Sequence, residues 1–240
     1  MKIVSIDNIK FFSLNDDELF SVINKNGLFV FPAAPALANI FDDKEYKNSL
    51  ENSDYVFFDS SFLCLYLSIF KSIKVKKLSG LFFLRKLLSS LKNDNKKIFL
   101  IDPNKEHSTS NKNYLNKIGQ DNTESYIAPF YKDKINDQKL IDQINEFRPE
   151  YIIINLGGGV QEKLGIYLKK NLREETKIIC TGAAIAFLTG LQANIPKIID
   201  QFYLGWFWRI LFNPKLYLKR YINAFKILIV LFKSNIEVIK

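Results

Sequence analysis

Three glycines and two polar side chains follow an apolar run in the stretch NLGGGVQE, which extends from Asn155 to Glu162. Glycine lets a ligand approach the backbone closely, and the first turn of a helix presents N–H groups that bind phosphate. Gln161 could hydrogen-bond a nucleobase or a sugar, whereas Glu162 could simply complement the helix dipole. The spacing matches neither GxGxxG nor GxxxxGK[ST], so it identifies no nucleotide. A turn that only reverses the chain fits the same residues.

A carboxylate, Asp59, ends the apolar run DYVFFD at residues 54–59 and is followed by Ser60 and Ser61. In an open α/β sheet, a carboxylate at the carboxyl end of a strand can serve as a general base. Asp and Ser are also residues that commonly cap the N-terminus of a helix. The residues alone leave both interpretations of Asp59 open.

Other catalytic chemistry finds little support in the sequence. His107 is the single histidine, and the two cysteines, Cys64 and Cys180, stand in apolar surroundings. We therefore expect two buried, reduced thiols, no metal site, and no histidine-activated nucleophile. Asp102 precedes Pro103 and indicates a plain turn. We also expect no signal peptide, and no uncharged run reaches the roughly 18–20 residues of a membrane-spanning helix.

Alternating patterns predict the elements that position these residues. Continuous apolar runs, typical of parallel strands buried on both faces, occur at 27–32, 54–59, 96–102, 150–157 and 176–182. Helical patterns occur at 61–71, 80–92, 107–118, 137–147 and 160–172. The alternation predicts a doubly wound, mostly parallel α/β sheet that binds ligands at the carboxyl ends of its strands. The stretch 119–136 lacks such a pattern and is expected to be a surface loop.

Positive charge is concentrated in the C-terminal part of the chain. The net charge is +9, and residues 196–240 hold eight Lys and Arg against two acids, so residues 1–195 are close to neutral. After Pro214, apolar residues recur at helical spacing with Lys219, Lys226 and Lys233 on the opposite side. We therefore expect an α/β domain over 1–195 and a basic, amphipathic helical appendage over 196–240.

Two interpretations of this tail compete. It could be a terminal helix docked on the core with its lysines in solvent, or an interfacial helix on an anionic membrane. Large apolar residues on nearly all sides of 221–232 favour the membrane, with Trp206, Trp208 and Tyr221 at headgroup level. A nucleic-acid partner is not expected, because nucleic-acid-binding surfaces are polar and positive. Docking on a second subunit, in a homo-oligomer, is also consistent with the pattern.

In order along the chain, these stretches match one family. Three successive blocks carry the match: NLGGGVQEKLG at 155–165, TGAAIAFLTGLQANIPK at 181–197 and YLGWFWRILFNPKLYLKRY at 203–221. Before them come FFDSS at 57–61, LSGLFFLRKLL at 78–88 and YIAPFY at 126–131. The chain resembles the WecB/TagA/CpsF glycosyltransferases, also called glycosyltransferase family 26, from Met1 to about residue 233.

The chain also departs from the family's pattern. The family's Asp-Gly is Asp59-Ser60 here, and its polar Thr-x-Asn after the first strand is replaced by the apolar FPAAP around Phe31 to Ala33. Family residues that carry charge are replaced by uncharged ones at Val160, Ala186, Asn194 and Gly205. These changes indicate a divergent member, whose donor sugar differs or whose catalysis is weakened or lost.

The resemblance implies a Rossmann-like domain with a membrane-associating C-terminal appendage. It implies transfer, with inversion, of an N-acetylhexosamine-type sugar from a UDP donor to a polyprenyl-diphosphate-linked acceptor, in the assembly of teichoic acid, capsule or exopolysaccharide. It further implies a peripheral position on the cytoplasmic face of the bacterial membrane, and no metal or cofactor besides the UDP-sugar substrate. On the same basis the catalytic residue is Asp59, and the substrate-binding residues are Gly157, Gln161, Glu162, Gly182, Pro129, Arg209 and Arg220.

Two other functions remain as alternatives. A catalytically silent relative could bind a nucleotide sugar or act as a membrane scaffold, and the lost polar residues near Phe31 motivate this reading. A dehydrogenase with a basic tail is a further alternative, and the missing GxGxxG argues against it.

Overall fold

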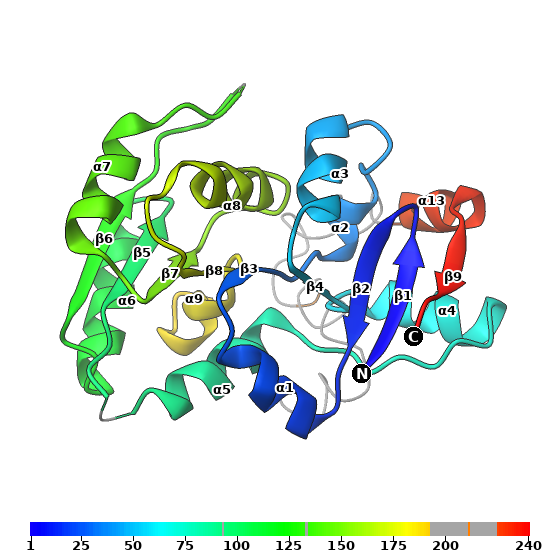
Figure 1. Ribbon diagram of the computed structural model, residues 1–240, viewed down its shortest axis with the longest axis horizontal. Helices are drawn as coiled ribbons and strands as arrows, with labels where there is room; N and C mark the ends of the chain where they lie inside the picture. The colour runs from blue at the N-terminus through cyan, green and yellow to red at the C-terminus, as the bar shows by residue number, and fades with distance from the viewer. Residues whose placement is uncertain (93, 133, 193–210, 212–224) are drawn as a thin grey trace.

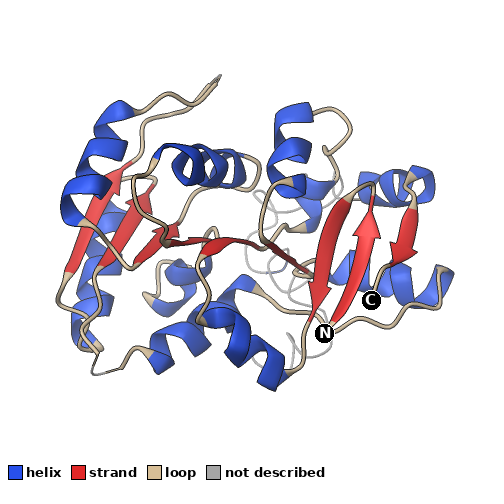
Figure 2. Cartoon of the chain, viewed as in Figure 1, coloured by secondary structure: helices blue, strands red, loops and turns tan. Residues whose placement is uncertain are grey.

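The computed structural model describes residues 1–92, 94–132, 134–192, 211 and 225–240. Its centre is a nine-stranded sheet with the strand order β6-β5-β7-β8-β3-β4-β2-β1-β9. All pairings are parallel except those that β1 makes with β2 and β9. Figure 2 shows the strands in red running through the molecule, with helices in blue on both sides. The α/β fold with a mostly parallel sheet is therefore confirmed.

The five predicted strands are all present, and they form the middle of the sheet. They are β3 (Gly27–Val30), β4 (Tyr55–Phe57), β5 (Ile98–Asp102), β7 (Tyr151–Ile154) and β8 (Lys177–Cys180). Nearly all their side chains are buried, because helices cover both faces of the sheet. Successive residues alternate between the two cores: Phe99 and Ile101 of β5 face one, and Ile98 and Leu100 face the other.

Helices cover the sheet in two layers, as Figure 1 shows. One core is closed by α2 (Ala34–Leu37), α3 (Lys44–Glu51), α4 (Ser61–Phe70), α7 (Gln138–Phe147), α8 (Val160–Asn171) and α13 (Lys226–Lys233). The other is closed by α1 (Asp16–Ile23), α5 (Gly80–Ser90), α6 (Lys105–Lys117) and α9 (Ala184–Leu188). The predicted helices at 61–71, 80–92, 107–118, 137–147 and 160–172 correspond to α4, α5, α6, α7 and α8.

The outer strands were not predicted from the sequence. β1 (Lys2–Ile6) and β2 (Ile9–Ser13) form a hairpin whose two-residue turn, Asp7-Asn8, has positive φ at both positions. The expectation of a surface loop over 119–136 is wrong in part, because β6 (Thr123–Ile127) pairs with β5 at one edge of the sheet. An edge strand is half solvated, and TESYI therefore lacks the continuous apolar run of the inner strands.

The described end of the chain packs against the sheet. α13 is a helix where the sequence predicted one, and it contacts α4 and α2. After it, β9 (Ile236–Val238) adds an unpredicted strand to the sheet by pairing with β1. Residues 196–210 and 212–224 of the predicted appendage lie outside the described residues, so its separate helical character stays a prediction. Within the described ranges, no helix is long and apolar enough to cross a membrane.

Candidate active site

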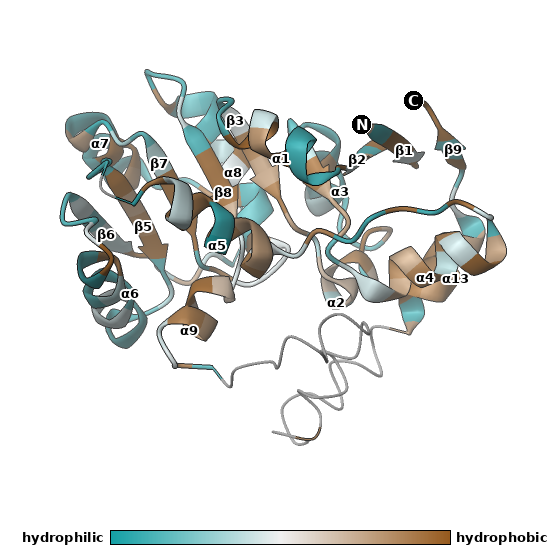
Figure 3. Cartoon of the chain, turned by 90° about the horizontal axis from the view of Figure 1, so that it is seen from below, coloured by the Kyte–Doolittle hydropathy of each residue, from teal (hydrophilic) through white to brown (hydrophobic). Residues whose placement is uncertain are grey.

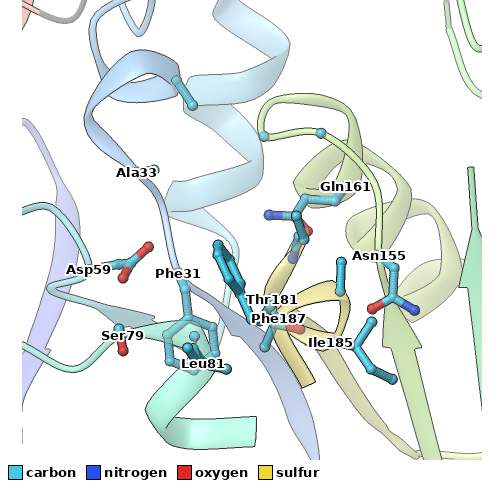
Figure 4. Close-up of a pocket in the computed structure, with 18 of the residues that line it drawn as sticks. Phe31, Ala33, Asp59, Ser79, Leu81, Asn155, Gln161, Thr181, Ile185 and Phe187 are labelled. Carbon is cyan, nitrogen blue, oxygen red and sulfur yellow. The ribbon is translucent and has the colours of Figure 1, made fainter. Parts of the chain in front are cut away.

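A pocket of about 1030 Å³ opens at the carboxyl ends of β3, β4, β7 and β8 (Figure 4). β3 and β8 are neighbours, yet β3 leads to α2 on one face of the sheet and β8 leads to α9 on the other. Chain connections that leave in opposite directions open a crevice between two adjacent strands, which is where open α/β sheets bind ligands. The fold thus creates the pocket where the sequence predicted one.

Asp59 lines this pocket, and it is the only carboxylate that does so among the described residues. Its backbone follows the buried β4 and the fully buried Phe58. The helix cap belongs to Ser60, whose Oγ accepts a hydrogen bond from Leu63 N at 3.2 Å. Since Ser60 caps α4, the carboxylate of Asp59 lies at the pocket wall, as Figure 4 shows. Ser60 is thus the residue that caps α4, and the role of Asp59 as a general base stays a prediction.

Gln161 joins the two glycine-containing turns at the floor of the pocket. Gly157 and Gln161 line the pocket after β7, and Gly182 lines it after β8. The side-chain Oε1 of Gln161 accepts the backbone N–H of Gly182 at 2.8 Å. Gly182 has φ +59°, a left-handed conformation that favours glycine. The structure therefore brings three predicted binding residues together, and it shows that Gln161 also fixes the relative position of the turns.

Glu162 has a different position from its neighbour. It is fully buried and does not line the pocket. Its Oε2 accepts the Gly159 N–H at 2.7 Å and its Oε1 accepts Gln161 Nε2 at 3.1 Å, so it caps the first turn of α8. Burial raises the pKa of Glu162 to about 7, against the hydrogen bonds that favour its charged form. The geometry gives Glu162 a structural role, and its predicted contact with a substrate gains no support.

The other predicted residues lie away from these turns. Pro129 follows the edge strand β6, is exposed, and does not line the pocket. Its role in substrate binding therefore stays a prediction. Arg209 and Arg220 lie outside the described residues, and their roles stay predictions.

Three cationic side chains that were not predicted from the sequence also line the pocket. Lys77 precedes α5, and Arg85 and Lys86 lie on that helix. The described lining residues thus carry three positive groups and one carboxylate. This excess of positive charge suits the binding of a diphosphate. Their signal was positional: a helix that begins at the pocket edge, with Ser79 as its cap, carries residues 85 and 86 along the wall.

One wall of the pocket is apolar, as the stretch FPAAP predicted. Ala33, Ala34 and Pro35 line it, and Phe31 stacks on Phe57 with ring centroids 4.9 Å apart. Phe31 is almost fully buried in that aromatic cluster. Hydrogen-bonding groups are therefore absent from the side chains of this described segment, and any ligand meets a hydrocarbon surface there.

Comparison with known proteins places the chain in a family. The model of the "Glycosyl transferase WecG/TagA/CpsF family" matches residues 4–239. The chain belongs to this family. It is the family that the resemblance predicted, although this description names WecG where the sequence analysis named WecB. The match spans both the described pocket and the predicted appendage.

Two bacterial relatives are similar to this chain over most of its length. One, from Bacillus subtilis (strain 168), is 22% identical over 222 residues, which cover 89% of this chain and 85% of the relative. The other, from Staphylococcus aureus (strain NCTC 8325 / PS 47), is 21% identical over 215 residues, covering 88% of this chain and 79% of the relative. Both are named N-acetylglucosaminyldiphosphoundecaprenol N-acetyl-beta-D-mannosaminyltransferase.

Proposed function

We propose that this protein transfers an N-acetylhexosamine-type sugar from a UDP donor to a polyprenyl-diphosphate-linked sugar, with inversion, in the assembly of a cell-surface polysaccharide. The family and the names of the relatives support sugar transfer to a lipid-linked acceptor. The observation that carries the proposal is Asp59, a carboxylate at the wall of a pocket whose other charged described residues are Lys77, Arg85 and Lys86.

The proposed reaction uses Asp59 as the general base. Its carboxylate accepts the proton of an acceptor hydroxyl while that oxygen forms a bond to the anomeric carbon of the donor sugar. The bond from that carbon to the diphosphate oxygen breaks, and its electron pair leaves with UDP. Attack from the side opposite the leaving group inverts the anomeric configuration.

The cationic wall would stabilise the leaving diphosphate. Lys77, Arg85 and Lys86 are placed to offset the negative charge that grows on the leaving oxygen. Arg209 and Arg220 in the predicted appendage are proposed to add to this charge once a lipid-linked substrate is bound. Gly157, Gln161 and Gly182 are proposed to bind the donor through backbone and amide groups at the pocket floor.

We further propose a peripheral position on the cytoplasmic face of the membrane. α4 and α13 lie side by side, and both are mainly brown, the colour of apolar residues, in Figure 3. Their packing leaves Ile229 and Phe232 of α13 at 59% and 66% exposed, and Ile69 and Phe70 of α4 at 67% and 59%. The rings of Phe70 and Phe232 lie against each other, with centroids 5.8 Å apart. An apolar surface of this kind suits the interfacial region of a bilayer, where a lipid-linked acceptor resides. A second subunit on the same face, in a homo-oligomer, is the competing occupant.

The decisive experiment measures UDP release and product formation with a panel of UDP-N-acetylhexosamines. The acceptor is a polyprenyl-diphosphate-linked N-acetylglucosamine in anionic vesicles, and the Asp59→Asn variant is assayed beside the wild type. Transfer that requires Asp59 is the expected result and names the donor. Full activity in Asp59→Asn would remove Asp59 from the mechanism.

The same experiment separates the catalytically silent alternative. The apolar wall around Phe31 and Ala33 motivates that alternative, because polar contacts of the family are missing there. Its signature is binding of UDP and vesicles without transfer from any donor in the panel. NAD binding in place of UDP binding would instead revive the dehydrogenase alternative.

A further inference from the structure

A buried carboxylate lies beneath the pocket, at the end of β5. Asp102 is fully buried, although its position before Pro103 indicated a plain turn. Its Oδ1 accepts two amide N–H groups, from Asn111 Nδ2 of α6 at 2.7 Å and from Asn155 Nδ2 at 2.8 Å. Both asparagines are buried as well, but only Asn155 lines the pocket.

The carboxylate determines how the Asn155 amide is oriented. A carboxylate only accepts hydrogen bonds, so the nitrogen of each asparagine must face Asp102. The oxygen of Asn155 must then point the other way. Figure 4 shows this arrangement, with the Asn155 oxygen on the side of Thr181 and Phe187 and its nitrogen turned away from them. Asn155 therefore presents a fixed hydrogen-bond acceptor to the pocket.

This acceptor has no partner within the described part of the protein. Asn155 Oδ1 is buried and makes no hydrogen bond, and the same holds for the hydroxyl of Thr181. The two residues come directly after Ile154 and Cys180, which pair in the register of β7 and β8, so they are neighbours at the pocket floor. Buried polar atoms are normally paired, so an unpaired one on a residue that lines a pocket calls for a partner, which a ligand can supply.

We infer that Asn155 Oδ1 accepts a hydrogen bond from an amide-type N–H of the donor, and that Asn155 is a specificity residue. The inference rests on the proposed function. A nucleotide sugar of the proposed class carries such an N–H in two places, the imide of the uracil ring and the acetamido group of the sugar. Asp102 is a positioning residue, because it accepts the Asn155 amide N–H and does not line the pocket. The Thr181 hydroxyl serves a neighbouring acceptor or donor of the same ligand.

The test compares ligands with and without each N–H by calorimetry. UDP is compared with N3-methyl-UDP, in which a methyl group replaces the imide hydrogen. UDP-N-acetylmannosamine is compared with UDP-mannose, which lacks the acetamido group. Each pair is measured on the wild type, on Asn155→Ala, and on Asn111→Ala, whose side chain also donates to Asp102 but does not line the pocket. Thermal unfolding of each variant without ligand reports whether it folds.

Two results support the inference and identify the source of the N–H. If the uracil imide donates to Asn155, N3-methylation weakens binding to the wild type by about tenfold or more, and this penalty largely disappears in Asn155→Ala. If the acetamido group of the sugar donates to Asn155, UDP binds the wild type and Asn155→Ala alike. The preference for UDP-N-acetylmannosamine over UDP-mannose then disappears in Asn155→Ala. In either case Asn111→Ala keeps the wild-type discrimination. Should Asn155→Ala fail to fold, the two ligand pairs on the wild type can still overturn the inference, because it requires a penalty in at least one of them.

Other results overturn it. Equal discrimination by the wild type and Asn155→Ala contradicts the inference while leaving the proposed function intact. The same holds if neither N–H affects wild-type binding, or if Asn111→Ala loses discrimination as completely as Asn155→Ala. Wild-type protein that binds none of the four nucleotides contradicts the proposed function itself.

Discussion

Two strand-to-helix turns at the pocket each carry a carboxylate, and the two carboxylates have opposite environments. At the turn between β4 and α4, Ser60 caps the helix and Asp59 lines the pocket. At the turn between β7 and α8, the cap position is Gly159, which has no side chain, and Glu162 itself accepts the Gly159 N–H. Glu162 is consequently buried inside the protein, while Asp59 stays at the pocket surface.

The difference shows what decides the role of an acid beside a helix N-terminus. The first N–H groups of a helix need acceptors, and a nearby side chain that supplies one is held in place by that bond. At the turn between β4 and α4, a serine supplies this acceptor, so the cap does not require the adjacent acid. Where glycine occupies the cap position, the acid in the first turn takes over the structural role.

Replacing each acid by its amide should give the largest difference between the two turns, measured as the turnover of sugar transfer. Asp59→Asn should lower the turnover of sugar transfer by about 10²–10⁴-fold, because it removes the proposed proton acceptor, and should leave the melting temperature close to that of the wild type. Glu162→Gln should keep turnover at pH 8 within a few-fold, since Glu162 does not line the pocket. Steady-state kinetics beside thermal unfolding provide the measurement. Comparable losses of turnover in both variants would mean that the contrast is false.

Glu162→Gln should instead change how stability depends on pH. The folded-state pKa of Glu162 is about 7, above its ordinary 4.5, so the folded protein binds the proton more tightly than the unfolded chain. The stability that this proton confers is fully present below about pH 4.5 and is lost as the pH rises through 7. The free energy of unfolding of Glu162→Gln, relative to wild type, should therefore rise by about 3 kcal/mol over that range. Urea titrations at several pH values measure it, and a flat difference would contradict the burial of a titrating Glu162.

Ser60→Ala should remove the side-chain cap of α4, which lies next to Asp59 in the chain. We expect a loss of about 1 kcal/mol in the free energy of unfolding, which is typical of a serine cap. Ser79→Ala is the matched control, because Ser79 caps α5 with the same Oγ to N distance of 3.2 Å. Ser60 is more deeply buried than Ser79, so its loss should be the larger. An unchanged stability in Ser60→Ala would indicate that another group, such as Asp59, has taken over the cap.

The inner sheet could be predicted from the sequence, whereas its edges could not. β3, β4, β5, β7 and β8 are buried on both faces and leave continuous apolar runs. β6 lies at an edge, and its exposed positions remove that signal. The hairpin of β1 and β2 is set by a two-residue turn, whose sequence Asp7-Asn8 is short and easily overlooked.

The candidate site was predictable where single residues mark strand ends. Asp59, Gly157, Gln161 and Gly182 were found in this way, because carboxyl ends of parallel strands gather at one edge. Glu162 was assigned to substrate on the basis of the resemblance, whereas the residues alone pointed to a role at the helix N-terminus. The pairing of Asp102 with Asn155 joins residues 53 positions apart, and only the register of β5 and β7 brings them together.

The smallest effect is expected for the hydroxyl of Tyr46, whose pKa is influenced by burial and by the charge of Glu162. Tyr46 lies on α3, which packs against α8, and its hydroxyl is buried without a partner among the described residues. Burial first, and then the charge of Glu162, raise the pKa of Tyr46. Removing an unpaired hydroxyl forfeits no hydrogen bond, so Tyr46→Phe should change the free energy of unfolding by less than about 1 kcal/mol at any pH.

The pH dependence makes this small prediction informative. If Tyr46→Phe destabilises the protein by more than that amount, and only above pH 7, the hydroxyl must donate to ionised Glu162 in solution. The Tyr46 hydroxyl would then stabilise the charged carboxylate of Glu162 at the turn between β7 and α8. A small, pH-independent effect would instead leave Glu162 as a cap whose buried charge is weakly compensated, in contrast to Asp59 at the pocket wall.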